Sequence, residues 1–120
     1  MVDNESQEMY LETILKLRKQ KGGVRSIDVA EELGYSKPSV SRAVGIMKKD
    51  GYIEVGADGN IELTPAGKEK AEGVFTRHKA LTEALVKMGL ERSAAEENAC
   101  RVEHVITEEA FLTIKKYFGV

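Results

Sequence analysis

Two short helical patterns lie close together between Ser26 and Gly51, and they constrain the fold more than any other feature. The first, "SIDVAEELGY", has Ser26 as a candidate N-cap, has apolar residues at helical spacing and stops at Gly34. The second, "SKPSVSRAVGIMKKDGY", opens with Ser36 as a candidate N-cap. Pro38 stands in its first turn, where proline is tolerated. Two helices joined this closely predict a helix-turn-helix.

An alternating pattern follows at once. The stretch "YIEVGADGNIELT" has a strong hairpin turn signal at Asp58-Gly59. Its apolar residues alternate on both sides of the turn, at Ile53, Val55, Ile61 and Leu63. A hairpin directly after a helix-turn-helix is a wing. A further helix over residues 6–21, "SQEMYLETILKLRKQK", precedes this unit, with Ser6 as its candidate N-cap.

The second half of the chain reads as helical throughout. The stretch from Thr64 to Gly89 begins with a Thr cap followed by Pro65 and predicts one long helix. Two shorter helices follow in "ERSAAEENACRVEHVI" and "TEEAFLTIKKYF", with Ser93 and Thr107 as candidate caps. We therefore predict a mainly α protein, with a winged helix-turn-helix domain over residues 1–65 and a helical domain over residues 66–120.

Composition indicates an ordinary soluble globular protein. Of the 120 residues, 42% are hydrophobic and 32% charged, which allows a real but modest core. No apolar run approaches the roughly 18 residues of a membrane span, and the polar start "MVDNESQE" does not resemble a signal peptide. The only cysteine has no partner for an internal disulfide. We expect a cytoplasmic protein with no membrane partner.

Charge is unevenly distributed along the chain. From Lys16 to Asp50, nine Lys or Arg stand against four Asp or Glu, a balance of +5 that leaves −7 for the rest. One interpretation is a phosphate-facing half joined to a half that binds something else. The other is a basic surface that is merely solvated. Charge alone does not decide between them.

The helix that opens at "SKPSVSR" is the candidate for reading DNA. In a helix-turn-helix, the second helix enters the major groove with its N-terminal residues at base edges and phosphates. Small polar side chains and one arginine, a bidentate donor suited to guanine, lie there. The candidate DNA-binding residues are Ser36, Lys37, Pro38, Ser39, Ser41 and Arg42. The alternative is a three-helix fragment whose polar residues are only solvated.

The stretch "NACRVEHV" carries a second chemical signal. If it is helical, Cys100, Glu103 and His104 stand at i, i+3 and i+4 and offer sulfur, oxygen and nitrogen donors on one face. The alternative is a small buried cysteine next to a solvated Glu-His pair. Further candidate donors lie elsewhere: Met9 and Glu12, spaced i, i+3, and His78, the only other histidine.

The order of these motifs resembles one known family. "EMYLETI", a winged helix, "TRH" in a long helix and then "ACRVEHV" resemble the DtxR/MntR family of metal-dependent transcriptional repressors. The resemblance implies a homodimer that binds a divalent metal between its DNA-binding and dimerisation halves and then grips a palindromic DNA operator. It also implies a primary metal site. The residues at the matching positions are Met9, Cys100, Glu103 and His104.

The same resemblance distinguishes iron from manganese members. Iron-sensing members have Met and Cys where manganese-sensing members have acidic residues, so this chain looks like the iron type. Glu12 and His78 match second-metal positions of manganese members, and His78 also matches the ancillary site of iron members. Thr82 stands where the family commonly has Glu, and Glu96 stands where iron members place a histidine. The sequence ends without the SH3-like domain of many iron members.

The expected function is therefore a metal-dependent DNA-binding repressor activated by iron(II). Manganese(II), cobalt(II), nickel(II) and zinc(II) are the alternative ions. The competing interpretation is a metal-independent winged-helix protein whose second half serves only for dimerisation or for a protein partner. We do not expect an enzyme, because the sequence has no "HExxH", no Gly-rich phosphate loop and no nucleophile paired with a base.

Overall fold

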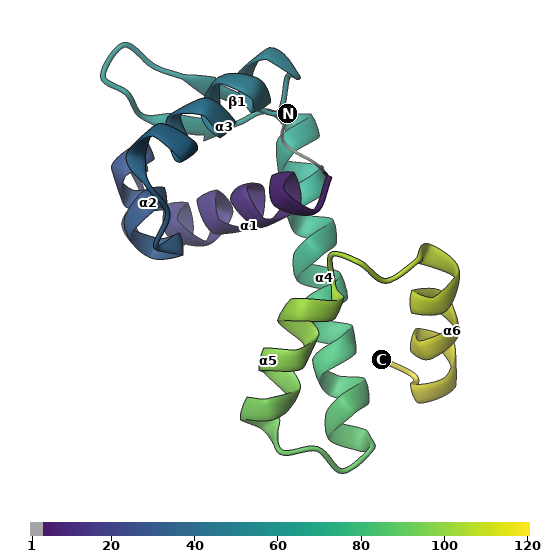
Figure 1. Ribbon diagram of the computed structural model, residues 1–120. Coiled ribbons are helices and arrows are strands. Elements are labelled where there is room, and N and C mark those ends of the chain that lie inside the picture. Colours follow the sequence, from purple (N-terminus) through teal and green to yellow (C-terminus); the bar gives the residue numbers. More distant parts are fainter. Residues whose placement is uncertain (1–3) are drawn as a thin grey trace. The chain divides into compact units, whose positions relative to one another are not determined.

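The computed structural model describes the backbone of residues 4–120 and the side chains from Ser6 onward, and it divides into two compact units (Figure 1). The first unit extends to Glu72 and the second is Gly73–Val120. The elements in chain order are α1 (Asn4–Lys21), α2 (Ser26–Leu33), α3 (Lys37–Lys49), β1 (Ile53–Val55), β2 (Ile61–Leu63), α4 (Pro65–Lys87), α5 (Arg92–Val102) and α6 (Glu108–Phe118). This confirms the mainly α prediction.

The helix-turn-helix is formed by α2 and α3. The first of these helices ends at Gly34, whose φ of 69° is the left-handed conformation that glycine adopts without strain. The N–H of Tyr35 then donates to the carbonyl of Ala30 at 3.1 Å, which closes the turn. α3 begins directly afterwards, where the Ser36 side chain accepts the N–H of Ser39 at 3.3 Å. The predicted motif is confirmed.

The core of the first unit draws on every one of its elements. The predicted apolar stripe of α3, Val40, Val44 and Met47, is buried. The largest side chains of this unit with less than 2% exposure are Leu11, Ile14, Val24, Val29, Val40, Met47, Ile53 and Ile61. Because these residues come from three helices and both strands, the hairpin is part of the core.

The wing is a two-stranded antiparallel hairpin. Ile53 pairs with Leu63 and Val55 with Ile61, as the alternation predicts. Gly59 has φ 84° in the connecting turn, where the Asp58 carboxylate accepts the N–H of Asn60 at 3.0 Å. The turn predicted at Asp58-Gly59 is therefore present.

The second unit packs the C-terminal part of α4 against α5 and α6. Its core consists of Ala80, Leu81, Ala99 and Phe111, with Ile106, Ile114 and Val120 packed against it. Alanines at such positions allow helix backbones to approach closely. Within residues 4–120, none of the helices has the length and apolar character needed to cross a membrane.

Three of the predicted helix caps are correct. Ser36 caps α3, as described above. Thr64 caps α4, because its Oγ1 accepts the N–H of Gly67 at 3.1 Å. Thr107 caps α6 by accepting the N–H of Ala110 at 3.2 Å.

Three other predicted caps are wrong. α1 already includes Ser6. α2 has Arg25 at its N-cap, and the Asp28 carboxylate accepts the Arg25 N–H at 2.8 Å, so Ser26 is the first helical residue. α5 begins at Arg92, and the Ser93 hydroxyl donates to the Glu91 side chain at 2.7 Å. The hydroxyl of a serine near a helix start has other partners available, so the residue type alone misplaces the boundary by one to three residues.

Gly67 lies where the start of α4 packs against the chain that enters the wing. A Cβ atom at this position would overlap the backbone carbonyl of Tyr52. That carbonyl is held in place because it accepts the N–H of Thr64 at 3.0 Å. Only glycine fits here without moving the backbone.

We expect Gly67→Ala to lower the free energy of unfolding by about 1–3 kcal/mol, the cost of overpacking a rigid site. The control is Gly73→Ala, also in α4, because no atom lies within 4 Å of its added Cβ. The control should be neutral or more stable by up to about 1 kcal/mol through helix propensity. Urea unfolding followed by circular dichroism measures both. Equal stability of the two variants would contradict the close packing at Gly67.

Candidate functional site

α3 presents a polar face to solvent. Its apolar residues Val40, Ala43, Val44 and Met47 are buried, so the remaining side chains of its first half point outward. The exposed residues include the predicted DNA contacts Lys37, Pro38, Ser39, Ser41 and Arg42. They are available to a partner without any change in the fold.

The start of α3 is suited to an anion. Ser36 accepts the Ser39 N–H, and its own hydroxyl donates to Ser39 Oγ at 2.8 Å. The hydroxyl proton of Ser36 is therefore used internally, whereas that of Ser39 remains available to donate outward. The first turn of α3 has no acidic residue, so the positive end of the helix dipole is not neutralised there.

The wing is acidic, in contrast to the first turn of α3. No lysine or arginine stands between Tyr52 and Thr64, and Glu54 lies directly opposite Glu62 in the hairpin register. Arg18 approaches Glu62 at 3.9 Å, while its other terminal nitrogen donates to the Ile61 carbonyl at 2.8 Å. Positive charge is therefore found on α3 and not on the wing. Lys48 and Lys49 lie in the last turn of α3.

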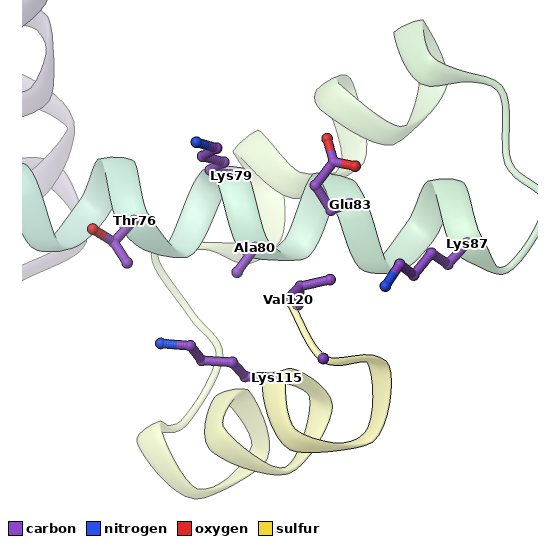
Figure 2. A pocket seen from close by; sticks show the side chains of 8 residues that line it. Thr76, Lys79, Ala80, Glu83, Lys87, Lys115 and Val120 are labelled. Atoms are coloured by element: carbon purple, nitrogen blue, oxygen red, sulfur yellow. The ribbon is translucent and has the colours of Figure 1, made fainter.

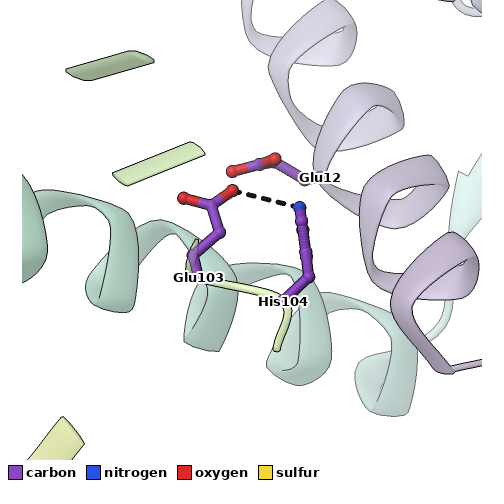
Figure 3. A group of neighbouring side chains, drawn as sticks. All are labelled: Glu12, Glu103 and His104. Carbon is purple, nitrogen blue, oxygen red and sulfur yellow. Dashed lines mark ion pairs between the residues drawn. The ribbon is translucent and has the colours of Figure 1, made fainter. Parts of the chain in front are cut away.

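The most unusual side chain of the second unit is Glu103, directly after the end of α5. Its carboxylate has 0% exposed side-chain area. One oxygen lies 2.7 Å from His78 Nδ1, and the other lies 3.2 Å from His104 Nε2. Figure 3 shows the Glu103 carboxylate and the His104 imidazole turned toward each other. The sequence predicted the adjacent Glu-His pair, but it gave no signal that His78, 25 positions away, contacts Glu103.

The Glu103 carboxylate is buried, and one of its oxygens lacks a hydrogen-bond donor within residues 4–120. The contact to His104 is short but poorly aligned, and Glu103 Oε1 has no hydrogen-bond partner among the residues described. Burying an ionised carboxylate without a partner is costly. A divalent cation at this position would supply the charge, and the oxygen of Glu103 and the nitrogen of His104 are donor types that transition-metal ions accept.

Hydrogen bonds from α4 also orient Glu103. Arg77 Nε donates to its backbone carbonyl at 2.9 Å. If His78 Nδ1 carries the proton and donates to the carboxylate, the lone pair of this imidazole lies on Nε2. A histidine oriented in this way by a carboxylate is the usual arrangement around a protein-bound metal.

Cys100 lies one helical turn before Glu103. Its side chain is an exposed thiol on α5. The helix ends at Val102, earlier than the predicted pattern, but the N–H of Glu103 still donates to the Ala99 carbonyl at 2.9 Å. The helical spacing between Cys100 and Glu103 is therefore retained, whereas His104 lies in the turn that follows.

A small pocket of about 130 Å³ brings together His78 and Glu96, the other predicted donors of this unit. Thr82 and Glu83 also line it. Thr82 is buried, and its Oγ1 has no hydrogen-bond partner among residues 4–120. Glu83 contacts the guanidinium of Arg92 at 2.9 Å, which lowers the pKa of its carboxyl below the ordinary value. Glu83 is thus an ionised carboxylate already paired with a cation.

The remaining predicted donors, Met9 and Glu12, belong to α1 of the first unit; Glu12 is also labelled in Figure 3. Both are half-buried, and their i, i+3 spacing is helical as predicted. The Met9 sulfur accepts a hydrogen bond from the Tyr35 hydroxyl at 3.3 Å. The sequence does not predict this contact, because a tyrosine in a connector between helices carries no pattern that shows which residue it will touch.

A larger pocket of about 610 Å³ lies between α4 and α6 in the second unit (Figure 2). It is lined by Lys79, Lys87 and Lys115 together with Glu83. Lys87 is already engaged, because its Nζ donates to the Phe118 carbonyl at 2.7 Å. None of the predicted metal ligands lines this pocket, so cavity size is not what indicates the metal site in this unit.

The second unit also exposes apolar side chains. Val105, Leu112 and Tyr117 are 62%, 51% and 82% exposed. The small residues Ala95 and Ala99 of α5, by contrast, are completely buried. Exposed apolar side chains thus lie on the α5–α6 turn and on α6, and also just after α4, where Met88 is 67% exposed.

Two sequence models of one family match the chain in order. Residues 4–60 match the DNA-binding N-terminal domain of iron dependent repressors, and residues 64–120 match the metal binding and dimerisation domain. The chain belongs to the iron-dependent repressor family. The winged helix-turn-helix lies within the range matched by the DNA-binding domain, and His78, Glu103 and His104 lie within the range matched by the metal binding and dimerisation domain.

Individual repressors of the family are also similar to this chain, two of them in sequence and one in structure. The chain is 35% identical over 103 residues to the diphtheria toxin repressor of Corynebacterium diphtheriae, covering 85% of this chain and 46% of that protein. It is 37% identical to the iron-dependent repressor IdeR of Mycobacterium tuberculosis, covering 85% and 45%. The crystal structure of IdeR from T. acidophilum superposes with a TM-score of 0.78 at 29% identity, covering 94% of this chain and 54% of that one. The chain spans about half the length of these repressors.

Glu103→Gln tests whether the buried carboxylate binds a cation. Glutamine keeps the shape and can still pair with neutral imidazoles, so metal-free stability should stay within about 1 kcal/mol. Cobalt(II) at a hundred times its dissociation constant should stabilise the wild type by about 2.7 kcal/mol and this variant far less. Urea unfolding with and without cobalt(II) measures the difference.

The matched control is Glu97→Gln, which removes the same charge from a 69% exposed position on α5. It should respond to cobalt(II) like the wild type. An equal response of the Glu103 variant would show that the buried carboxylate is neutralised by histidine alone.

Proposed function

We propose that this member of the family is a cytoplasmic, homodimeric transcriptional repressor whose binding to operator DNA is activated by a divalent metal, with iron(II) as the physiological ion. One observation carries the proposal: a carboxylate without exposed area lies between two imidazoles, in a chain whose other unit presents an exposed recognition helix. A bound cation would compensate the charge of the buried carboxylate. The recognition helix gives the chain a DNA partner.

In this proposal the primary metal ligands are Met9, Cys100, Glu103 and His104. The two last residues are supported by their contact in the second unit. Met9 and Cys100 are assigned from the sequence resemblance alone, as are Glu12, His78 and Glu96 as ligands of a second ion. When bound, a divalent ion supplies the positive charge that the Glu103 carboxylate lacks. His78 and Arg77 hold that residue in place through the contacts described above.

Ligand softness supports iron over manganese. The thioether of Met9 and the thiolate of Cys100 are soft donors, whereas manganese(II) prefers carboxylates and other hard oxygen donors. Cobalt(II), nickel(II) and zinc(II) share this tolerance for sulfur, so all three should also activate the protein in solution.

DNA recognition is proposed for the first half of α3. Arg42 is exposed, and its guanidinium group can donate two hydrogen bonds to guanine in the major groove. Ser36, Lys37, Pro38, Ser39 and Ser41 complete the proposed contact set. In this assignment the DNA-binding domain is residues 1–65, and residues 66–120 bind metal and dimerise.

Dimerisation is proposed through the exposed apolar residues of the second unit. Contact with a second copy would cover Val105, Leu112 and Tyr117, which are otherwise left in water. A two-fold dimer predicts a palindromic operator with half-sites about 34 Å apart, or a multiple of that distance.

A metal-independent repressor that only dimerises through its second unit is the competing function, and the same exposed apolar residues favour it. The two functions differ in one observable: only the proposed one requires a metal for operator binding. Neither involves catalysis, and we propose no enzymatic activity.

The deciding experiment selects binding duplexes from a random pool under anaerobic conditions, first with iron(II) and then with a chelator. We expect iron(II) to tighten operator binding by roughly 5- to 150-fold, the range of ordinary allosteric coupling. Arg42→Ala is the control for DNA reading and should weaken specific binding by about 1–3 kcal/mol under every metal condition. Operator affinity that is unchanged by the chelator would establish the metal-independent alternative.

Metal choice is tested by replacing the two soft donors. Met9→Asp combined with Cys100→Glu should shift activation of operator binding from iron(II) towards manganese(II). The control is Gln20→Glu with Asn98→Asp, which adds the same charges to α1 and α5 at positions with no predicted ligand role. Operator affinity is measured against free iron(II) and free manganese(II). An unaltered preference in a double variant that remains folded would remove Met9 and Cys100 from the proposed site.

A further inference from the structure

Tyr35 connects two parts of the first unit that have separate roles in the proposed function. It stands in the connector between α2 and α3, with its side chain against α1. Its hydroxyl donates to the sulfur of Met9 at 3.3 Å. Its ring packs edge-to-face on Tyr10, with centroids 6.0 Å apart and planes at 72°. Two neighbouring residues of α1 therefore hold both the ring and the hydroxyl of Tyr35.

The backbone of Tyr35 belongs to the recognition motif. Its N–H closes the end of α2 by donating to the Ala30 carbonyl at 3.1 Å. The next residue is Ser36, the N-cap of α3. The atom that contacts the Met9 sulfur is thus carried by the residue immediately before the N-cap of the helix proposed to read DNA.

The chemistry of a thioether makes this contact relevant to a metal ligand. Methionine has three rotatable side-chain bonds, so a sulfur without a fixed position loses conformational entropy when it binds an ion. A hydrogen bond from Tyr35 holds the sulfur in one place. Sulfur has two lone pairs, so one can accept the hydroxyl proton while the other stays available as a donor.

We propose that Tyr35 is a positioning residue that holds the Met9 thioether ready for the metal and links it to the first turn of the recognition helix. This inference rests on the proposed function, and within it on Met9 as a ligand. A group that fixes Met9 also fixes the Tyr35 hydroxyl, and through it the connector that starts α3. Metal and DNA are then coupled inside the first unit, and the coupling is reciprocal.

Tyr35→Phe tests the proposal because it removes the hydroxyl and keeps the ring on Tyr10. We expect cobalt(II) affinity, measured by visible absorption, to fall about tenfold, the low end of effects seen when a group that orients a metal ligand is lost. The gain in operator affinity on adding cobalt(II) should shrink, while metal-free operator affinity stays unchanged. Tyr10→Phe removes the equivalent atom from the packed partner ring and should leave both quantities unchanged.

A second readout does not involve metal. In metal-free protein labelled at its methionine methyl groups, Tyr35→Phe should move the Met9 methyl resonance, because the sulfur loses its hydrogen-bond donor. A Met9 resonance that stays in place would overturn the contact itself.

Met9→Leu separates failure of this inference from failure of the proposed ligand set. If Met9→Leu leaves cobalt(II) affinity unchanged, Met9 is not a ligand, and the ligand assignment and the inference both fall. If Met9→Leu weakens binding but Tyr35→Phe does not, only the inference is overturned. Support requires that Tyr35→Phe weakens binding in the wild type and has no further effect in the Met9→Leu background. An equal loss in both backgrounds would show that Tyr35 acts elsewhere, and would overturn it too.

Discussion

A carboxylate without water is the constraint on which the second unit depends. Glu103 has no exposed side-chain area, and its nearest polar partners are two imidazoles. An ionised carboxylate away from solvent is costly unless a cation lies beside it. If a divalent ion binds there as proposed, it stabilises the folded unit, so metal affinity and the stability of the unit would be linked.

Much of the fold can be predicted from the sequence because its signals are local. Gly34 followed by Ser36 marks the turn of the helix-turn-helix, and Asp58-Gly59 marks the wing, through backbone conformations that few residues adopt easily. The caps show the limit of such signals. Ser36 caps its helix, whereas Ser93 donates to Glu91 instead. A hydroxyl near a helix start can bond to several neighbouring groups. The sequence does not show which of these groups lies within hydrogen-bond distance.

The candidate site is less accessible to sequence reasoning because its important contacts join distant segments. Spacing within one helix predicted that Cys100, Glu103 and His104 belong together. The contact between His78 and Glu103 depends on how α4 packs against the end of α5, which is decided by the buried alanines and Phe111 of the core. The Tyr35–Met9 contact likewise requires the helix crossing in the first unit, and no local pattern encodes it.

The acidic wing has a consequence for the proposed recognition of one DNA site among many. Attraction between lysine or arginine and phosphate is nearly independent of sequence, so it strengthens binding to random DNA as much as to the operator. A wing with Glu54 and Glu62 and without basic residues contributes little to that background. In the proposed function, discrimination between the operator and random DNA then depends on the base contacts of α3 and not on phosphate attraction by the wing.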